Sequence, residues 1–214
     1  MTKNRNRQRT QAIGERLKEL RSERRMTLQD VQKKTGVAIS TLSKIENQQV
    51  SASFDTLTRI CNGLGVAIET FFNPMPTMLA SGRRTITRRE DEDAVFETAQ
   101  YRYKVHSTEL SAKGMVPLEM RVKARSIEDF VELNRHHGEE FVFVIAGELE
   151  VHTEFYAPFR LKAGESCYFD SEMGHAYLSV SPEDAHILSV CYDPSRSSAV
   201  GTFLYDDGST AEPV

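Results

Sequence analysis

A histidine and a glutamate stand at positions from which their side chains can share one site. His136 and Glu140 are four residues apart in a stretch that continues into the apolar run 141–146, and His175 closes a second stretch that begins at a turn. Residues two or four apart in an extended strand face the same side, so in a small barrel His136 and Glu140 share one cavity. Imidazole and carboxylate groups suit either a divalent metal ion or a polar small molecule. We therefore expect His136 and Glu140 to form part of a metal site or an effector pocket.

The chain around these residues has the pattern of an antiparallel β-barrel or sandwich. Beyond about residue 95, short stretches rich in Val, Phe, Tyr and Ile show no helical period. Turn residues separate them at 113–114, 146–147, 162–164 and 173–174. The pattern predicts an all-β domain over 96–214.

The preceding part of the chain predicts an all-α domain of five short helices. Ile13, Leu17 and Leu20 recur at helical spacing, and Thr27 with Asp30 has the form of a capping box. A glycine at position 36 is placed to end the second helix. Three further helical segments lie at about 40–47, 53–64 and up to residue 72. We expect a basic flexible arm over 1–12, the helical domain over 13–72 and a linker over 73–95.

The net charge of −4 conceals a division between the two parts. From Met1 to Arg89 the chain holds 17 Lys and Arg against 7 Asp and Glu, and from Glu90 to Val214 it holds 10 against 24. A basic segment suits a polyanion because neutralised phosphates release counterions, whereas an acidic segment is repelled by DNA. The charge division predicts two separate tasks.

Membrane and disulfide-rich classes do not fit the composition. No apolar run approaches the roughly 20 residues that span a bilayer. The basic start, Met1 to Arg9, is followed by no apolar segment of a secretory signal. Cys61, Cys167 and Cys191 are odd in number and widely spaced, so we expect reduced, buried thiols rather than disulfides or a zinc finger. We expect a cytoplasmic protein with no membrane partner.

Residues 28–47 satisfy the offsets of a helix-turn-helix. Val31, Val37, Leu42 and Ile45 supply the buried contacts, which leaves small or cationic side chains free to enter a major groove, namely Ser40, Thr41, Ser43 and Lys44. The stretch resembles the phage-repressor and Xre-type helix-turn-helix family over roughly 13–72. Gln32 departs from it, since the family usually has alanine there at a close helix crossing.

The basic residues before the first helix are a second candidate for DNA contacts. Arg5, Arg7 and Arg9, together with Lys3, can reach a neighbouring minor groove or phosphates, as basic arms do in other DNA-binding folds. A solvated tail without a DNA contact is the alternative.

Residues 134–147 and 163–175 resemble the two motifs of the cupin superfamily. The resemblance implies a double-stranded β-helix barrel and a divalent metal, zinc, iron, manganese or nickel, held by His136, Glu140 and His175. Asn134 stands where the family has its first histidine, and an amide oxygen is a poorer ligand than imidazole. A metal-free polar pocket is therefore the alternative. His137 is out of phase with the inward-facing positions.

Together the two resemblances imply a transcriptional regulator rather than an enzyme. The helix-turn-helix would read operator double-stranded DNA as a homodimer, since one motif contacts only a few base pairs. The barrel would sense a small-molecule effector or a metal and shift the DNA affinity. A metal-dependent cupin enzyme, a dioxygenase or isomerase with an attached reader, is the second hypothesis. A third is a barrel that serves only for dimerisation, which a cavity filled by side chains would favour.

Overall fold

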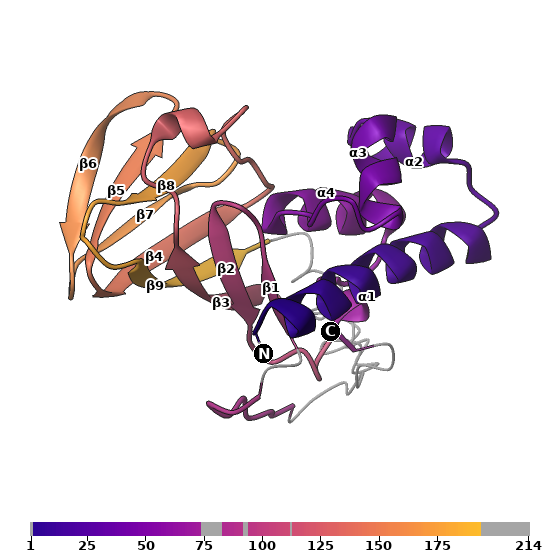
Figure 1. Cartoon of the computed structure of the whole chain (residues 1–214), viewed down its shortest axis with the longest axis horizontal. Helices are drawn as coiled ribbons and strands as arrows, with labels where there is room; N and C mark the ends of the chain where they lie inside the picture. The colour runs from indigo at the N-terminus through magenta and orange to yellow at the C-terminus, as the bar shows by residue number, and fades with distance from the viewer. Residues whose placement is uncertain (1, 74–82, 92–93, 112, 194–214) are drawn as a thin grey trace, which may run out of the picture.

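The structure, a computed structural model, describes residues 2–73, 83–91, 94–111 and 113–193, with side chains from Ile13 onward. A group of helices stands at one end of the molecule and a β-barrel at the other (Figure 1). The helical domain contains α1 (Thr2–Glu23), α2 (Leu28–Thr35), α3 (Ile39–Glu46), α4 (Phe54–Leu64) and the 3-10 helix η1 (Ile68–Phe71). Among the described residues, none of the helices combines the length and apolar composition that a bilayer crossing requires.

Local capping sets the limits of α2. The backbone N–H of Thr27 donates to Asp30 Oδ2 over 2.8 Å, and the N–H of Asp30 donates to Thr27 Oγ1 over 3.2 Å. At the other end Gly36 takes the left-handed conformation, with φ of 67°, which a residue with a side chain rarely adopts. Both signals were predicted from the sequence and are confirmed. α4 likewise begins after Ser53, whose hydroxyl accepts the N–H of Thr56.

Two helical predictions differ from the structure. The segment 2–12, predicted to be a flexible arm, forms the first turns of α1. Its residues are mostly good helix formers, and extending a helix costs little once its amphipathic part has nucleated it. The predicted fifth helix is the 3-10 helix η1 rather than an α-helix. Four α-helices and one short 3-10 helix therefore stand where five helices were expected.

Close backbone approaches hold the small helices together. A Cβ added to Gly14 of α1 would lie 2.2 Å from the carbonyl oxygen of Ile45 in α3, so only glycine permits this contact. α2 and α4 approach at Gly63, where a Cβ would lie 2.6 Å from the carbonyl oxygen of Lys34. Gln32 is exposed and does not line this approach. The departure from the family pattern at position 32 therefore leaves the crossing intact.

The C-terminal domain is built from two antiparallel sheets that form a barrel. The larger has the order β1-β2-β3-β9-β4-β7 and the smaller β6-β5-β8. The strands are β1 (Val95–Glu97), β2 (Tyr101–Val105), β3 (Met115–Val122), β4 (Glu139–Ala146), β5 (Glu148–Thr153), β6 (Tyr156–Lys162), β7 (Ser166–Asp170), β8 (His175–Ser179) and β9 (Ala185–Tyr192), with a 3-10 helix η2 (Ile127–Asp129) between β3 and β4. Buried and less buried residues alternate along β3 and β9, as expected for strands with one face toward a core.

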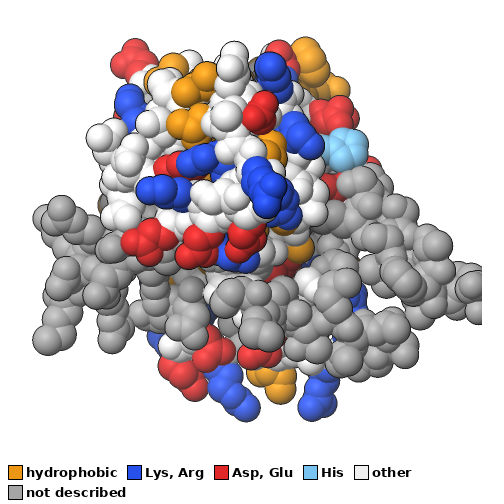
Figure 2. Space-filling model, turned by 90° about the vertical axis from the view of Figure 1, so that its right-hand side faces the viewer, with side chains coloured by type: hydrophobic (Ala, Val, Ile, Leu, Met, Phe, Trp, Pro, Cys, Tyr) orange, Lys and Arg blue, Asp and Glu red, His pale blue; other side chains and the backbone are white. Residues whose placement is uncertain are grey.

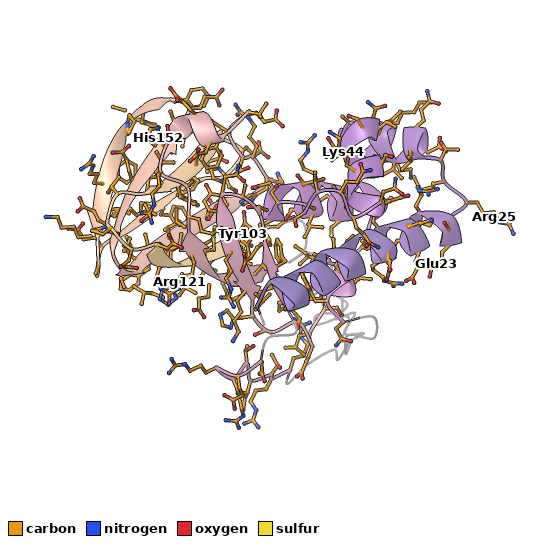
Figure 3. The ribbon with its side chains drawn as sticks, in the orientation of Figure 1. Glu23, Arg25, Lys44, Tyr103, Arg121 and His152 are labelled. Atoms are coloured by element: carbon orange, nitrogen blue, oxygen red, sulfur yellow. The ribbon has the colours of Figure 1, made fainter. Side chains whose placement is uncertain are left out.

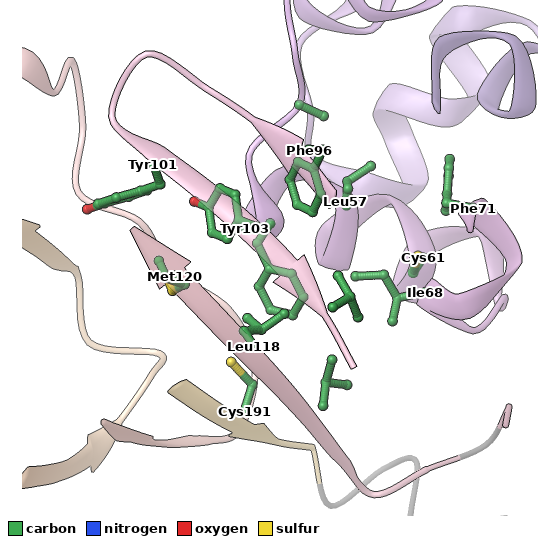
Figure 4. Packing of buried hydrophobic residues seen from close by; sticks show 14 of the residues in the cluster. Leu57, Cys61, Ile68, Phe71, Phe96, Tyr101, Tyr103, Leu118, Met120 and Cys191 are labelled. Atoms are coloured by element: carbon green, nitrogen blue, oxygen red, sulfur yellow. The ribbon is translucent and has the colours of Figure 1, made fainter. Parts of the chain in front are cut away.

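One apolar core runs through both domains. Figure 4 shows Leu57 and Cys61 of α4, with Ile68 and Phe71 of η1, facing the side chains of β1, β2 and β3. Phe96 of β1 lies in the same buried cluster. This interdomain core, formed by α4 and η1 against β1–β3, means that the helical domain is packed on the barrel.

The predicted linker is packed on the barrel in its described part, 83–91. Arg83 Nη1 donates to the carbonyl oxygen of Ser111 over 2.8 Å. Lys104 Nζ donates to the carbonyl oxygens of Arg88 and Arg89, each over 3.1 Å. The remainder of the predicted linker, 74–82 and 92–93, lies outside the described residues, as do positions 194–214 of the predicted β domain.

Candidate functional site

The barrel brings the three predicted donors together from both sheets. Glu140 is the second residue of β4 and alternates inward with Val142 and Val144, while His136 lies just before that strand. His175 is the first residue of β8 in the smaller sheet. The segment before β4 is held near β8 because Asn134 and His175 exchange two backbone hydrogen bonds, of 3.0 and 2.9 Å.

The three side chains converge on one carboxylate oxygen. Glu140 Oε2 lies 3.1 Å from His136 Nε2 and 3.5 Å from His175 Nε2. The two imidazole rings stand edge to face, with centroids 5.4 Å apart. Each of the three side chains is only 3% exposed. The donor atoms therefore meet in the buried interior of the barrel.

Hydrogen bonds on the outer side of this cluster orient it. Tyr177 Oη and Ser189 Oγ donate to Glu140 Oε1 over 2.8 and 2.6 Å, which leaves Oε2 for the two histidines. His175 Nδ1 lies 3.0 Å from the carbonyl oxygen of Met173, which can only accept a hydrogen bond, so Nδ1 donates it and Nε2 is the ring nitrogen that faces Glu140. Burial opposes ionisation of Glu140, but the hydrogen bond and charge of His136, with His175, lower its pKa to about 2. Glu140 is an anion at neutral pH.

Two further donors lie at this cluster that sequence reasoning missed. Cys191 of β9 places its Sγ 3.8 Å from His136 Nε2, and burial raises the pKa of this thiol. Asp55, from the first turn of α4, places Oδ1 4.0 Å from His175 Nε2. Burial raises the pKa of Asp55, while His136 and His175 lower it. The inward phase of β9 was a usable signal for Cys191, but no local pattern connects a helix of the first domain to this cavity.

The other histidines lie apart from the cluster, and His137 was predicted to do so. His137 is about half exposed and pairs with Glu172. The remaining three pair with glutamates on the strands, His106 and His186 with Glu119, and His152 with Glu150. Cys61 and Cys191 are buried, as the sequence predicted, whereas Cys167 is only partly buried.

The space beside the three donors is small. The cavity that His136, Glu140 and His175 line has a volume of about 20 Å³, and its wall includes Phe54 and Asp55 of α4. A single water or ion needs roughly 10 to 15 Å³, whereas drug-sized ligands occupy roughly 300 to 1,000 Å³. With α4 in place this cavity holds one ion or one water, not an organic effector.

A larger groove lies nearby, between the edge strands β6 and β7. Its volume is about 610 Å³, and its lining includes the aromatic side chains Phe155, Tyr156, Phe159, Tyr168 and Phe169. The ring of Phe169 is 5.1 Å from that of His175, so one wall of the groove touches the buried cluster. The groove has the size and the apolar lining of a small-molecule site.

The predicted reading helix is α3, and its exposed side carries the residues expected to reach DNA. Ser40 and Lys44 are exposed, whereas Thr41 and Ser43 are partly buried. Lys44 lies apart from Tyr103, which marks the contact with the barrel (Figure 3). We call Ser40, Thr41, Ser43 and Lys44 the reading face.

An ion pair fixes α3 to α1 beneath this face. Arg21 Nε and Nη2 bind the two carboxylate oxygens of Glu46 over 2.7 and 2.9 Å. This two-pronged geometry orients both side chains. The end of α3 is therefore held rigidly against the long helix.

The basic charge around the reading face is modest. From Ile13 to Asn73 the sequence has 9 Lys and Arg against 7 Asp and Glu. Figure 2 accordingly shows blue and red side chains mixed on this end of the molecule. Most of the basic excess thus lies in the flanking segments. The side chains of Arg5, Arg7 and Arg9 are outside the described part, and their backbone lies in the end of α1 beside the barrel, away from α3 (Figure 1).

Comparisons with known proteins agree with this division. Residues 14–74 match the family described as a helix-turn-helix domain, and residues 127–191 match the cupin domain. An HTH_3 family transcriptional regulator from Vibrio cholerae is 23% identical, with 88% of this chain and 99% of that chain covered and a TM-score of 0.61. Hydroxypropylphosphonic acid epoxidase from S. wedmorenis is 22% identical, with 86% and 98% covered and a TM-score of 0.46. A search of curated proteins found no match.

The fold and the family matches define the class. The chain joins an Xre-like helix-turn-helix domain to a cupin domain. A helix-turn-helix domain followed by a cupin domain is the combination that the sequence predicted.

Proposed function

We propose that this protein is a DNA-binding transcriptional regulator, that it binds one divalent metal ion through His136, Glu140 and His175, and that occupancy of the barrel changes its affinity for operator DNA. The observation that carries the proposal is the convergence of two imidazole nitrogens on one ionised carboxylate oxygen in a buried cavity. A buried carboxylate needs a compensating cation or several hydrogen bonds.

The donor spacing fits a metal ion. Two atoms bound to one ion at about 2.1 Å stand about 3.0 Å apart in an octahedron and about 3.4 Å in a tetrahedron. The distances from Glu140 Oε2 to the two histidines, 3.1 and 3.5 Å, are of this size. Two nitrogens and one oxygen suit zinc, iron, manganese or nickel. When bound, the ion would supply a positive charge that ties β4 to β8.

The small-molecule effector, if it enters the barrel domain, fits the groove between β6 and β7 rather than the cavity of about 20 Å³. Its aromatic lining suits a partly apolar molecule, and Phe169 connects it to His175. The near-filled cavity favours the dimerisation hypothesis over an effector at the three donors, but it leaves room for an ion.

DNA reading is assigned to the reading face of α3, in a homodimer. A single recognition helix contacts few base pairs, so two copies would bind half-sites about one helical turn apart. Arg5, Arg7 and Arg9 would add phosphate contacts rather than base contacts, since their backbone lies away from α3. A protein with this task acts in the cytoplasm, beside the chromosome.

The enzyme hypothesis requires room for a substrate beside the ion. In the structure Phe54 and Asp55 of α4 take part in closing that space. A pocket of about 420 Å³ shares Asp55, Tyr101 and Asn134 with this cavity, so the metal-dependent enzyme stays the second hypothesis.

The proposal is tested with full-length protein. In an isolated helical domain, the faces of α4 and η1 that pack in the interdomain core would be exposed to solvent. Bound metal is measured by elemental mass spectrometry, and DNA affinity is measured by fluorescence anisotropy on a palindromic operator selected from a random library, with and without a chelator. We expect about one ion per chain and a chelator-dependent change of about 5- to 150-fold in DNA affinity.

His175→Ala should abolish both effects, while His152→Ala, which removes an imidazole outside the cavity, should leave them intact. Wild-type protein that takes up no metal and responds to no chelator would overturn the proposal.

A further inference from the structure

The first turn of α4 closes the cupin cavity from the side of the DNA-binding domain. Phe54 packs its ring edge to face on His136, with centroids 6.1 Å apart, and stacks on Tyr103 of β2. The next residue, Asp55, is 8% exposed and lines the same cavity. A carboxylate of the helical domain is thus buried inside the site of the barrel domain.

Asp55 lacks the side-chain hydrogen bonds that hold the neighbouring carboxylate. Its closest imidazole, that of His175, stands 4.0 Å away, too far for a hydrogen bond. No other described side chain donates a hydrogen bond to it, whereas Glu140 accepts hydrogen bonds from both Tyr177 and Ser189. A buried charge in this position is costly unless a cation compensates it.

The donor atoms form two overlapping sets around the cavity. Those of Asp55, His136 and His175 lie within 4.8 Å of one another, and so do those of His136, Glu140 and Cys191. His136 belongs to both sets. The cavity of about 20 Å³ between them has the size of a single ion or water.

We propose that Asp55 is an additional ligand of the metal ion, so that the ion joins the DNA-binding domain to the barrel. This inference rests on the proposed metal site at His136, Glu140 and His175. The family motifs place all their ligands in the barrel, and Asp55 adds one from outside it. At 4.0 Å from His175 Nε2, the Asp55 carboxylate is farther than the spacing of two ligands on one ion, so it moves closer on binding.

This arrangement connects the metal site to the helix that is proposed to contact DNA. α4 follows the reading helix after only the short segment 47–53, and α3 is held to α1 by the Arg21–Glu46 ion pair. A displacement of the first turn of α4 on metal binding would therefore occur one short loop away from the reading face. The rest of α4 stays packed in the interdomain core (Figure 4).

Metal titrations of full-length variants test the inference. Zn²⁺ affinity is measured by competition with a chromophoric chelator, and the absorption spectrum of the Co²⁺ form reports the ligand set. Asp55→Asn keeps the shape but removes the charge, and we expect it to weaken Zn²⁺ binding by at least about tenfold, since even outer partners of metal ligands contribute about 10- to 100-fold. It should also change the Co²⁺ spectrum.

Two variants serve as controls. Asp55→Glu keeps a carboxylate and should recover part of the affinity. Asp30→Asn makes the same change in the first turn of α2, away from the barrel, and should leave Zn²⁺ affinity and the Co²⁺ spectrum unchanged. Hydrogen exchange adds a structural readout: Zn²⁺ should slow exchange of the first amides of α4 in wild type but not in Asp55→Asn.

The outcomes separate this inference from the proposed function. Wild type that binds Zn²⁺ through His175 while Asp55→Asn keeps the same affinity, spectrum and exchange pattern overturns the role of Asp55 alone. Wild type that binds no Zn²⁺ overturns both.

Discussion

Phe54 of α4 stacks on Tyr103 of β2 across the boundary between the two domains, with ring centroids 6.4 Å apart and planes inclined by 30°. Tyr103 stacks in turn on Phe96, at 4.6 Å, and Phe96 on Phe72, at 5.8 Å. An aromatic row thus starts and ends in the helical part and passes through the barrel strands. Such a row couples the stability of the two domains.

Replacing Phe54 by Ala should lower the free energy of unfolding by about 3 kcal/mol, the usual loss for a buried aromatic ring. The full chain should unfold in one cooperative transition in urea, followed by circular dichroism with a chelator present so that metal does not contribute. Phe155→Ala is the control, since that ring is 73% exposed and its removal should cost less than about 1 kcal/mol. Two separate transitions in wild type would contradict the coupling.

Changes on the reading face should divide into two kinds. Lys44→Ala should weaken binding to all DNA sequences and reduce the salt slope by about 1 if Lys44 contacts a phosphate. Ser40→Ala and Thr41→Ala should instead alter the preferred sequence, at about 1 to 3 kcal/mol for each hydrogen bond to a base edge that the variant can no longer make. Anisotropy titrations at several salt concentrations measure both effects. Lys162→Ala changes an exposed lysine of β6 and should alter neither the DNA affinity nor the preferred sequence. Unchanged binding by the α3 variants would show that the reading face is wrongly assigned.

Asn134 lines the cavity at the position where the cupin motif has a histidine. Asn134→His should tighten metal binding by at least about tenfold, because imidazole is a much better ligand than an amide oxygen. Chelator competition measures the increase in affinity, and a urea titration checks that the larger ring is accommodated. A folded variant with unchanged metal affinity would mean that position 134 does not face the ion.

Tyr177→Phe removes one of the two hydroxyl groups that hold Glu140 Oε1. Metal affinity should fall by about 10- to 100-fold, the effect of losing a partner that orients a ligand. Tyr168→Phe offers a matched control, since the Tyr168 side chain lies on the exposed strand β7. Equal metal affinities for the two variants would indicate that Tyr177 serves packing only.

The local features of both domains were predictable because they depend on neighbours in the sequence. The capping box at Thr27 and Asp30, and the left-handed Gly36, follow from hydrogen bonds and backbone sterics within a few residues. The alternation that turns Glu140 into the barrel follows from the two-residue period of a strand. The family motifs completed the assignment of a helix-turn-helix and a cupin.

The positions of the charged residues in space were harder to predict from the sequence. The sequence shows a basic first half, but the compact helical domain carries little of that excess, and the segment with Arg5, Arg7 and Arg9 extends α1 toward the barrel. The helix continues through this segment because its residues are mostly good helix formers and the amphipathic part of α1 has already nucleated it. The sequence therefore determined that the protein has a basic N-terminal part, and the tertiary structure decided where that part lies.

The sequence by itself predicted a helix-turn-helix region followed by a cupin-like barrel, and it predicted the reading face of α3 and the group His136, Glu140 and His175 as candidate sites. Only the tertiary structure decided that α4 would seal the cavity and place Asp55 against His175. The physical reason is that docking of the helical domain depends on the complementary apolar surfaces of α4, η1 and β1–β3. Those surfaces are contributed by residues far apart in the chain, and periodicity shows that each is apolar but not which other surface it meets.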